Sequence, residues 1–240
     1  MKLYSLLALL IAAFTLTSCS SSPKESQDLA IAENAWTVLF DGEQTHDLRG
    51  YGIKSFPEGV WYIEEGKLTT NPDTANRDLV TNDEFKNFEL EYDWAVDTAA
   101  NSGVFFHVQE KKAMESGNGN SPNWLDNFEI QILDDLYFPD TAKIRSAGAL
   151  YDLIIPQNKE LKTIGEFNHA RLKVKNKHVE HWLNGHKVLD FEIGSKDLNQ
   201  RIANSKFKDN PDFAVDTVGH IMFQHHGQKV YFKNIRIREI

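Results

Sequence analysis

Cysteine is almost absent from this chain, whose 240 residues include one Cys and three Met. A single cysteine excludes an intrachain disulfide. Basic residues are also few, since 26 Lys and Arg against 35 Asp and Glu give a net charge of −9. That acidic balance argues against a nucleic-acid partner. With 41% hydrophobic and 25% charged residues, the composition excludes a wholly disordered chain and allows a single large β-sandwich.

Several catalytic and metal-binding motifs are missing as well. The sequence has no Gly-Lys-Ser/Thr phosphate loop and no GxSxG nucleophile elbow. It contains nine His, but none of them follows HxH or HExxH spacing, so the sequence does not predict a dedicated zinc site.

The first residues have the features of a lipoprotein signal peptide. An apolar run from Leu3 to Leu16 follows a positive start and is too short to span a bilayer. Leu16-Thr17-Ser18-Cys19 matches a bacterial lipobox, and the single Cys occupies the acceptor position. We therefore expect cleavage after residue 18 and lipidation of Cys19, the alternative being an ordinary secretory signal with a chance Cys.

The rest of the chain divides into a tether and one domain. Residues 19–34 are rich in Ser, Glu, Gln and Asp, which predicts a flexible tether ahead of a domain over 35–240. Ser20 follows the lipidated position where Asp would favour inner-membrane retention. We expect lipid anchoring in the bacterial cell envelope, at the outer membrane in a Gram-negative host.

Alternating apolar and polar residues predict an all-β domain. Phe88 to Trp94 and Phe128 to Leu133 alternate cleanly, and Asn184-Gly185 predicts a tight hairpin. Further strands are expected at 102–108, 170–174, 179–183, 187–193, 220–224 and 230–237. Only Ser195 to about Phe207 is expected to be helical, with Ser195 as N-cap.

The polar faces of these strands carry the candidate functional residues. Glu129 and Gln131 lie two apart and so share one face. By the same parity Asn101 shares a face with His107, and Gln224 shares one with His226. Each pattern also fits a merely solvated strand face, and His181 has the parity of a buried core residue. Trp124 adjoins a long polar loop, Lys111 to Asn123, of the kind that often borders a site.

A conventional two-carboxylate glycosidase fits these residues poorly. That chemistry needs two carboxylates roughly 5–10 Å apart. The next acid after Glu129 on its strand is Asp134, which at about 3.3 Å per residue lies roughly 16 Å away and on the opposite face. A partner on another strand, such as Glu91 or Asp93, stays possible.

Several motifs, in order, resemble one family. The chain is similar to the 3-keto-disaccharide hydrolase, or 3-keto-glucoside 1,2-lyase, family (domain of unknown function 1080) from about Trp36 to Ile240. The motifs are 101-NSGVFF-106, 129-EIQILD-134, 148-GALY-151, 180-EHWLNG-185, 219-GHIMFQHHG-227 and 230-VYFKNIRI-237. The resemblance implies a concanavalin A-like jelly roll of two antiparallel sheets. It also implies cleavage of glycosides oxidised at carbon 3.

The implied chemistry needs one base instead of two close carboxylates. A ketone at C3 acidifies the C2 hydrogen, so a base can remove it and the C1 oxygen can leave, with water adding back. The resemblance suggests Glu129 or His226 as the base. Gln131, Gln224 and Tyr151 would hold hydroxyls or the enolate, and His107, Asn101, Asp134 and Trp124 would complete the substrate site. The sequence specifies no cofactor, and a divalent cation on Glu129 and neighbouring oxygens or imidazoles is an alternative stabiliser of the enediolate.

The sequence also allows other functions, and it departs from the family pattern at a few positions. The same fold suits a non-catalytic carbohydrate-binding lipoprotein, and a structural envelope role is the residual. The chain departs from the family pattern at His107, His225 and near Phe138, positions expected at the rim. The family also implies a separate oxidoreductase that supplies the 3-keto sugar, because this chain has no dinucleotide-binding fingerprint.

Overall fold

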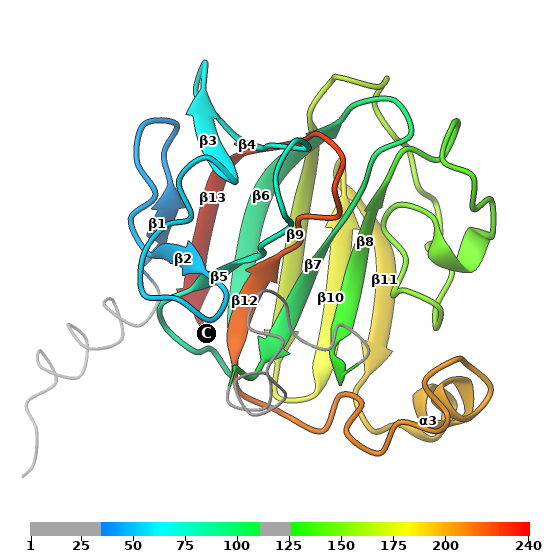
Figure 1. Cartoon of the computed structure of the whole chain (residues 1–240). Helices are drawn as coiled ribbons and strands as arrows, with labels where there is room; N and C mark the ends of the chain where they lie inside the picture. Colours follow the sequence, from blue (N-terminus) through cyan, green and yellow to red (C-terminus); the bar gives the residue numbers. More distant parts are fainter. Residues whose placement is uncertain (1–34, 111–125) are drawn as a thin grey trace, which may run out of the picture. The chain divides into compact units, whose positions relative to one another are not determined.

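The computed structural model describes residues 35–110 and 126–240, which form a sandwich of two antiparallel sheets (Figure 1). The larger sheet has the strand order β11-β10-β9-β6-β13-β4-β3, and β1 pairs with β13. Its strands are β1 (Thr37–Phe40), β3 (Trp61–Glu64), β4 (Lys67–Thr70), β6 (Phe88–Val96), β9 (Asn168–Lys175), β10 (His178–Leu183), β11 (His186–Glu192) and β13 (Val230–Glu239).

The smaller sheet lies in front of the larger one in Figure 1 and has the order β2-β5-β12-β7-β8. Its strands are β2 (Leu48–Gly50), β5 (Leu79–Thr81), β7 (Asn101–Val108), β8 (Phe128–Leu133) and β12 (His220–Phe223). Each strand of this sheet pairs antiparallel with its neighbour. The predicted all-β sandwich of two antiparallel sheets is therefore confirmed.

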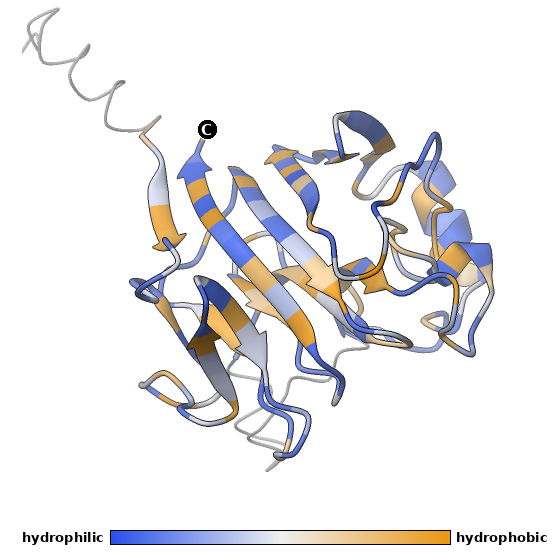
Figure 2. Ribbon diagram, turned by 90° about the horizontal axis from the view of Figure 1, so that it is seen from above, coloured by the Kyte–Doolittle hydropathy of each residue, from blue (hydrophilic) through white to orange (hydrophobic). Residues whose placement is uncertain are grey.

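The core lies between the sheets, and the strands reach it through alternate residues. Phe88, Leu90, Tyr92 and Trp94 of β6 are all buried in the main hydrophobic cluster, as their period-two spacing predicts. Figure 2 shows hydrophobic and hydrophilic residues alternating along the long strands. The hairpin between β10 and β11 turns at Asn184-Gly185, both with positive φ, as this dipeptide predicts.

The outer face of the larger sheet carries a ladder of cross-strand ion pairs. Glu89 of β6 contacts Arg171 of β9 and Arg238 of β13, and Arg236 bonds Glu91 at 2.5 Å. Opposite charges placed side by side on neighbouring strands stabilise their register. These charged side chains of β6, β9 and β13 are thus paired with one another.

One short helix was expected and α3 (Lys196–Ala203) confirms it, although it ends before Phe207. The Ser195 side chain accepts a hydrogen bond from the Leu198 amide at 3.2 Å, the N-cap that the sequence predicts. A 3₁₀ turn, η2 (Lys143–Arg145), precedes the Gly148–Tyr151 motif. His181 is buried as expected, but its Nδ1 has no hydrogen-bond partner.

Within the ranges 35–110 and 126–240, no helix is long and apolar enough to cross a membrane. The predicted signal peptide, Cys19, the tether and Trp124 lie outside the described residues.

Candidate active site

A cluster of polar side chains lies on the outer face of the smaller sheet, turned away from the main core. Glu129 of β8 is cross-strand neighbour to Phe105 of β7, and Gln131 is neighbour to Gly103. A Cβ at Gly103 would lie 2.8 Å from Glu129 Cγ and 2.9 Å from Cδ, so any larger residue there would force the Glu129 side chain to shift. The missing side chain of Gly103 therefore makes room for the Glu129 carboxyl above β7.

The Glu129 carboxyl is buried, with 7% of the residue exposed. Burial is the main reason that the pKa of Glu129 is raised to about 8; the Lys206 ammonium partly opposes this rise and the Asp78 carboxylate adds to it. A carboxyl deprived of water becomes a stronger base once it loses its proton. Such a perturbed group on a polar face is typical of a catalytic acid or base.

Amides border Glu129 along β7 and β8. With its amide oriented to satisfy its neighbours, Gln131 donates from Nε2 to Glu129 Oε1 at 2.9 Å. The Asn101 and Gln131 side-chain amides lie 3.3 Å apart and are both buried. The predicted face of Glu129, Gln131 and Asn101 is thus brought together as the alternation of β7 and β8 predicts.

Gln224 closes the cluster from the β12 side. Its backbone N–H donates to the Gly103 carbonyl at 2.9 Å, which places it directly across from Gly103. Its side-chain Oε1 is buried and has no hydrogen-bond partner. An acceptor buried without a donor is costly in the free protein, and a ligand hydroxyl would satisfy it.

The Gly148–Tyr151 motif runs beside β8 and places Tyr151 next to Glu129. The Tyr151 amide donates to the Glu129 carbonyl at 3.0 Å, and Gly148 donates to the Gln131 carbonyl at 2.8 Å. Burial, with a contribution from Glu129, raises the pKa of Tyr151 to about 12. The phenol therefore stays protonated over the working range of an enzyme and can donate a proton or a hydrogen bond.

Lys206 is a residue of this site that sequence reasoning missed. Its Nζ lies 3.9 Å from the centroid of the Tyr151 ring, and its backbone N–H donates to Asp152 Oδ2 at 3.3 Å. Burial lowers the pKa of Lys206, while the Asp152 and Glu129 carboxylates raise it. The ammonium thus supplies positive charge near Glu129.

Aromatic packing carries Lys206 to this position from a distant part of the sequence. Phe207 stacks on Phe213 at 4.1 Å, and Phe213 packs edge-on against Phe128, the residue before Glu129. Arg145 of η2 bonds Asp152 at 2.8 Å and fixes the turn to which the Lys206 backbone is bonded. No local sequence motif predicts that Lys206 lies near Glu129, because a lone Lys after a helix is normally exposed to solvent.

The expected face of His107 is wrong. Three residue steps on β7, from Phe105 to Val108, match two on β12, from Met222 to His220, so β7 contains a one-residue bulge. His107 takes a positive φ of 58° there. Its buried ring packs edge-on against Phe88, and its Nε2 contacts the Lys86 carbonyl at 3.1 Å. The bulge therefore turns His107 away from Asn101 and the Glu129 face.

The prediction that His226 shares a strand face with Gln224 is wrong, because the strand ends before both residues. Strand β12 ends at Phe223, so alternation does not extend to His226, which is exposed and contacts Gln228 at 3.0 Å through Nδ1. The neighbouring His225 is the buried one, and its Nε2 contacts the Asn71 carbonyl at 3.0 Å. Of the two predicted base candidates, Glu129 is buried and His226 is exposed.

Asp134 has the contacts of a structural cap. One carboxylate oxygen accepts from the Ala99 amide at 2.7 Å, and the other accepts from Leu136 at 2.9 Å and Tyr137 at 3.3 Å. It closes the turns on either side of the β7 and β8 ends, and it also lines a cavity of about 440 Å³. Its lone pairs hold backbone groups, so the structure does not join Asp134 to the Glu129 cluster as predicted.

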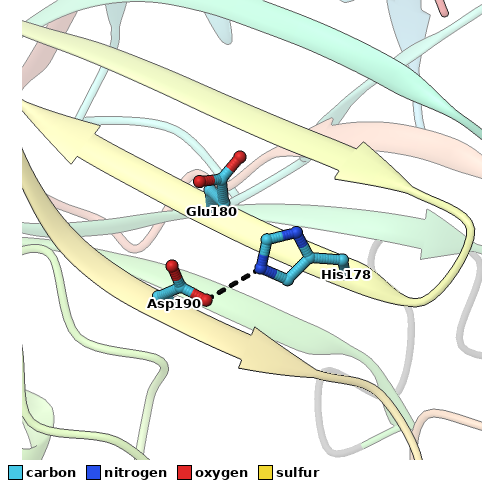
Figure 3. A group of neighbouring side chains, drawn as sticks. All are labelled: His178, Glu180 and Asp190. Carbon is cyan, nitrogen blue, oxygen red and sulfur yellow. Dashed lines mark hydrogen bonds and ion pairs between the residues drawn. The ribbon is translucent and has the colours of Figure 1, made fainter.

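A possible metal-binding group among the described residues lies on the other sheet. The ligand atoms of His178, Glu180 and Asp190, on β10 and β11, all lie within 4.8 Å of one another (Figure 3). His178 bonds Asp190 at 2.8 Å, and the Lys187 ammonium lies 2.9 Å from Glu180 and 2.6 Å from Asp190. Lys187 already supplies the positive charge that a cation would bring, and no cofactor is established for the chain.

Comparison with known proteins places the chain in a family. The 3-keto-alpha-glucoside-1,2-lyase-like domain matches residues 35–238. The chain belongs to this family. It is 32% identical to the 3-keto-disaccharide hydrolase of Bacteroides thetaiotaomicron over 248 residues, which cover 92% of this chain and 84% of that protein. The family resemblance of the motifs is therefore confirmed.

Solved structures agree with the fold of this 3-keto-alpha-glucoside-1,2-lyase-like domain. A crystal structure from Parabacteroides distasonis, named as a candidate glycosyl hydrolase, matches with a TM-score of 0.75 and 28% identity, covering 92% of this chain and 98% of that one. The laminarinase catalytic domain of Thermotoga maritima matches with a TM-score of 0.50 and 11% identity, covering 85% and 98%. The latter likeness concerns the glucanase-like jelly roll alone.

Proposed function

We propose that this protein cleaves the glycosidic bond of disaccharides and related glycosides oxidised at carbon 3, with Glu129 as the base. The observation that carries the proposal is the buried Glu129 carboxyl, which lies in a cluster of amides over Gly103. Membership of the family and the named activity of the Bacteroides relative support the substrate class.

The reaction begins with removal of the proton at C2. The Glu129 carboxylate takes this proton, and the electron pair of the C–H bond moves into the enediolate of C2, C3 and the ketone oxygen. The enediolate then expels the C1 oxygen, which takes up a proton as it leaves, and the ketone re-forms beside a C1=C2 double bond. Addition of water across that double bond gives net hydrolysis.

The described neighbours of Glu129 match the other requirements of the reaction. Gln131 and Gln224 offer amide groups to sugar hydroxyls or to the enediolate oxygen. Tyr151 and Lys206, whose Nζ lies 3.9 Å from the Tyr151 ring centroid, offer protonated groups to the leaving oxygen. Positive charge near the forming enediolate lowers the energy of the transition state, as a preorganised site requires.

The decisive experiment follows aglycone release from a 3-keto-glucoside and from the parent unoxidised glucoside. We expect release from the keto sugar alone. Glu129→Gln should abolish turnover, whereas His226→Ala, which changes an exposed side chain, should retain it. Full activity of Glu129→Gln would refute the assignment of the base. Release from the parent glucoside would point to a conventional glycosidase instead.

Two additional arms separate the remaining alternatives. Loss of turnover in EDTA, restored by a divalent cation, would indicate that a metal bound to Glu129 stabilises the enediolate. Binding of either sugar without release of the aglycone would move the protein to the non-catalytic carbohydrate-binding function. The expected result is turnover that EDTA leaves unchanged, because Lys206 already places a cation near Glu129.

The proposed substrate and the N-terminal sequence imply a setting. A 3-keto sugar forms only when a hydroxyl at C3 is oxidised, so a separate oxidoreductase must act first. The lipobox ending at Cys19 supports attachment of the protein to the bacterial cell envelope, in a Gram-negative host at the outer membrane. Labelling cells with a radioactive fatty acid, with Cys19→Ala as the control, tests that attachment.

A further inference from the structure

Tyr51 belongs to the same face of the smaller sheet as Glu129 but enters it from the opposite edge. It directly follows β2, and its amide donates to the Asp78 carbonyl at 2.8 Å, beside β5. Its ring forms one buried cluster with Phe105 of β7, the cross-strand neighbour of Glu129, and with Met222 of β12. The Tyr51 ring therefore packs among apolar side chains on the same outer face of the sheet as Glu129.

The Tyr51 hydroxyl is the unusual feature of this side chain. The residue is 1% exposed, yet its hydroxyl has no hydrogen-bond partner. Burial, together with the Glu110 and Asp78 carboxylates, raises the pKa of Tyr51 well above its ordinary value. The phenol is therefore a permanent donor without an acceptor, and such a group costs about 1–3 kcal/mol in the free protein.

A second buried atom without a hydrogen-bond partner is an acceptor, and so complements the Tyr51 donor. Gln224 Oε1 is a buried acceptor without a donor, and Gln224 follows β12, next to β5. Asp78 comes directly before β5, and its Oδ1 accepts the His225 amide at 2.7 Å, which binds this part of β5 to the segment after β12. Tyr51 follows β2 and Gln224 follows β12, the two strands that flank β5. An unsatisfied donor and an unsatisfied acceptor on either side of β5 match the two hydrogen-bonding roles of a sugar hydroxyl.

We propose that Tyr51 and Gln224 form a sugar-binding subsite, in which the Tyr51 hydroxyl donates to an oxygen of the bound glycoside and Gln224 Oε1 accepts from one of its hydroxyls. The inference rests on the proposed function and deepens it, because it extends the site from β8 across the sheet to β2. The subsite recognises the sugar and takes no part in the transfer of the C2 proton.

Tyr92 provides a matched control within the same fold. Its hydroxyl is also buried without a partner, but its ring lies in the core between the sheets, against Phe223 and Phe232. Tyr51→Phe and Tyr92→Phe each delete one unsatisfied hydroxyl and preserve the ring. Both variants should therefore raise the melting temperature of the protein without sugar, since each removes a buried donor that lacks an acceptor.

The two variants should differ in sugar recognition. For a 3-keto-α-glucoside disaccharide, Tyr51→Phe should raise KM roughly three- to tenfold with kcat nearly unchanged, as expected for one neutral hydrogen bond, and Tyr92→Phe should leave both constants unchanged. Calorimetric binding of the same sugar to Glu129→Gln, with and without Tyr51→Phe, should show the same loss of affinity in the absence of turnover.

The outcomes separate this inference from the proposed function. A higher melting temperature for Tyr51→Phe with unchanged KM and affinity would overturn the subsite and leave the proposed function intact. A lower melting temperature would show that the hydroxyl has a partner within the protein, which also overturns the subsite. Absence of both turnover and binding in the unaltered protein would overturn the proposed function and the subsite together.

Discussion

The buried carboxyl of Glu129 should leave a measurable signature in the pH dependence of folding. Its pKa is about 8 in the folded chain, against an ordinary value of 4.5. Between these values the folded chain holds a proton that the unfolded chain releases, so the free energy of unfolding falls as pH rises. The full difference corresponds to about 5 kcal/mol, of which about 3 kcal/mol is lost between pH 4.5 and pH 7.

Glu129→Gln removes this dependence because an amide carries no charge at any pH. We expect the variant and the unaltered protein to have similar stability near pH 4.5, and the variant to become more stable by about 3 kcal/mol at pH 7. Urea unfolding at pH 5, 6, 7 and 8 measures the difference. Glu58→Gln serves as the control, since Glu58 is exposed and remains in water in both states.

The result that refutes this reasoning is a constant stability difference across the pH range. It would mean that water reaches the carboxyl in the folded chain. An inactive variant with no pH-dependent gain would then owe its inactivity to something other than the loss of a desolvated base. A gain that grows with pH, together with lost turnover, would connect the burial of Glu129 to its role.

Three further variants test the surroundings of the site. Gly103→Ala should displace the Glu129 carboxyl and lower kcat on the order of 10²-fold. It should also lower the free energy of unfolding by about 1–3 kcal/mol, and this loss should be much smaller in a Glu129→Ala background. Unchanged activity would contradict the close approach of Gly103 to the Glu129 side chain. Lys206→Met should raise the pKa of Glu129 and so move the acidic limb of the pH profile of kcat/KM to higher pH. Lys206→Arg, which keeps the positive charge, should leave this limb where it is in the unaltered protein. An unmoved limb in Lys206→Met would show that Lys206 and Glu129 are not coupled. Asp134→Ala should cost about 2–3 kcal/mol in urea unfolding because three amides lose their acceptor, with KM unchanged; a large rise in KM would return Asp134 to the substrate site.

The accuracy of the sequence-based predictions follows from the range of the interactions involved. Alternation along β8 correctly placed Glu129 and Gln131 on one face, because strand geometry is local. A one-residue bulge in β7 turns the His107 side chain to the face opposite the predicted one, and no residue pattern in β7 marks that bulge. Lys206 reaches Glu129 only through packing between segments far apart in the chain, which periodicity does not record.

The aromatic packing that positions Lys206 also connects the site to local unfolding. The segment after α3 is attached to β8 through Phe213 on Phe128, and the Ala214 amide donates to the Asp126 carbonyl at 2.8 Å. If this segment opens without the sheets, the ammonium leaves and the charged form of Glu129 loses its counter-charge. Ionisation of Glu129 should therefore hold the segment closed. After correction for the intrinsic pH dependence of amide exchange, hydrogen exchange over residues 195–214 should become slower as pH rises.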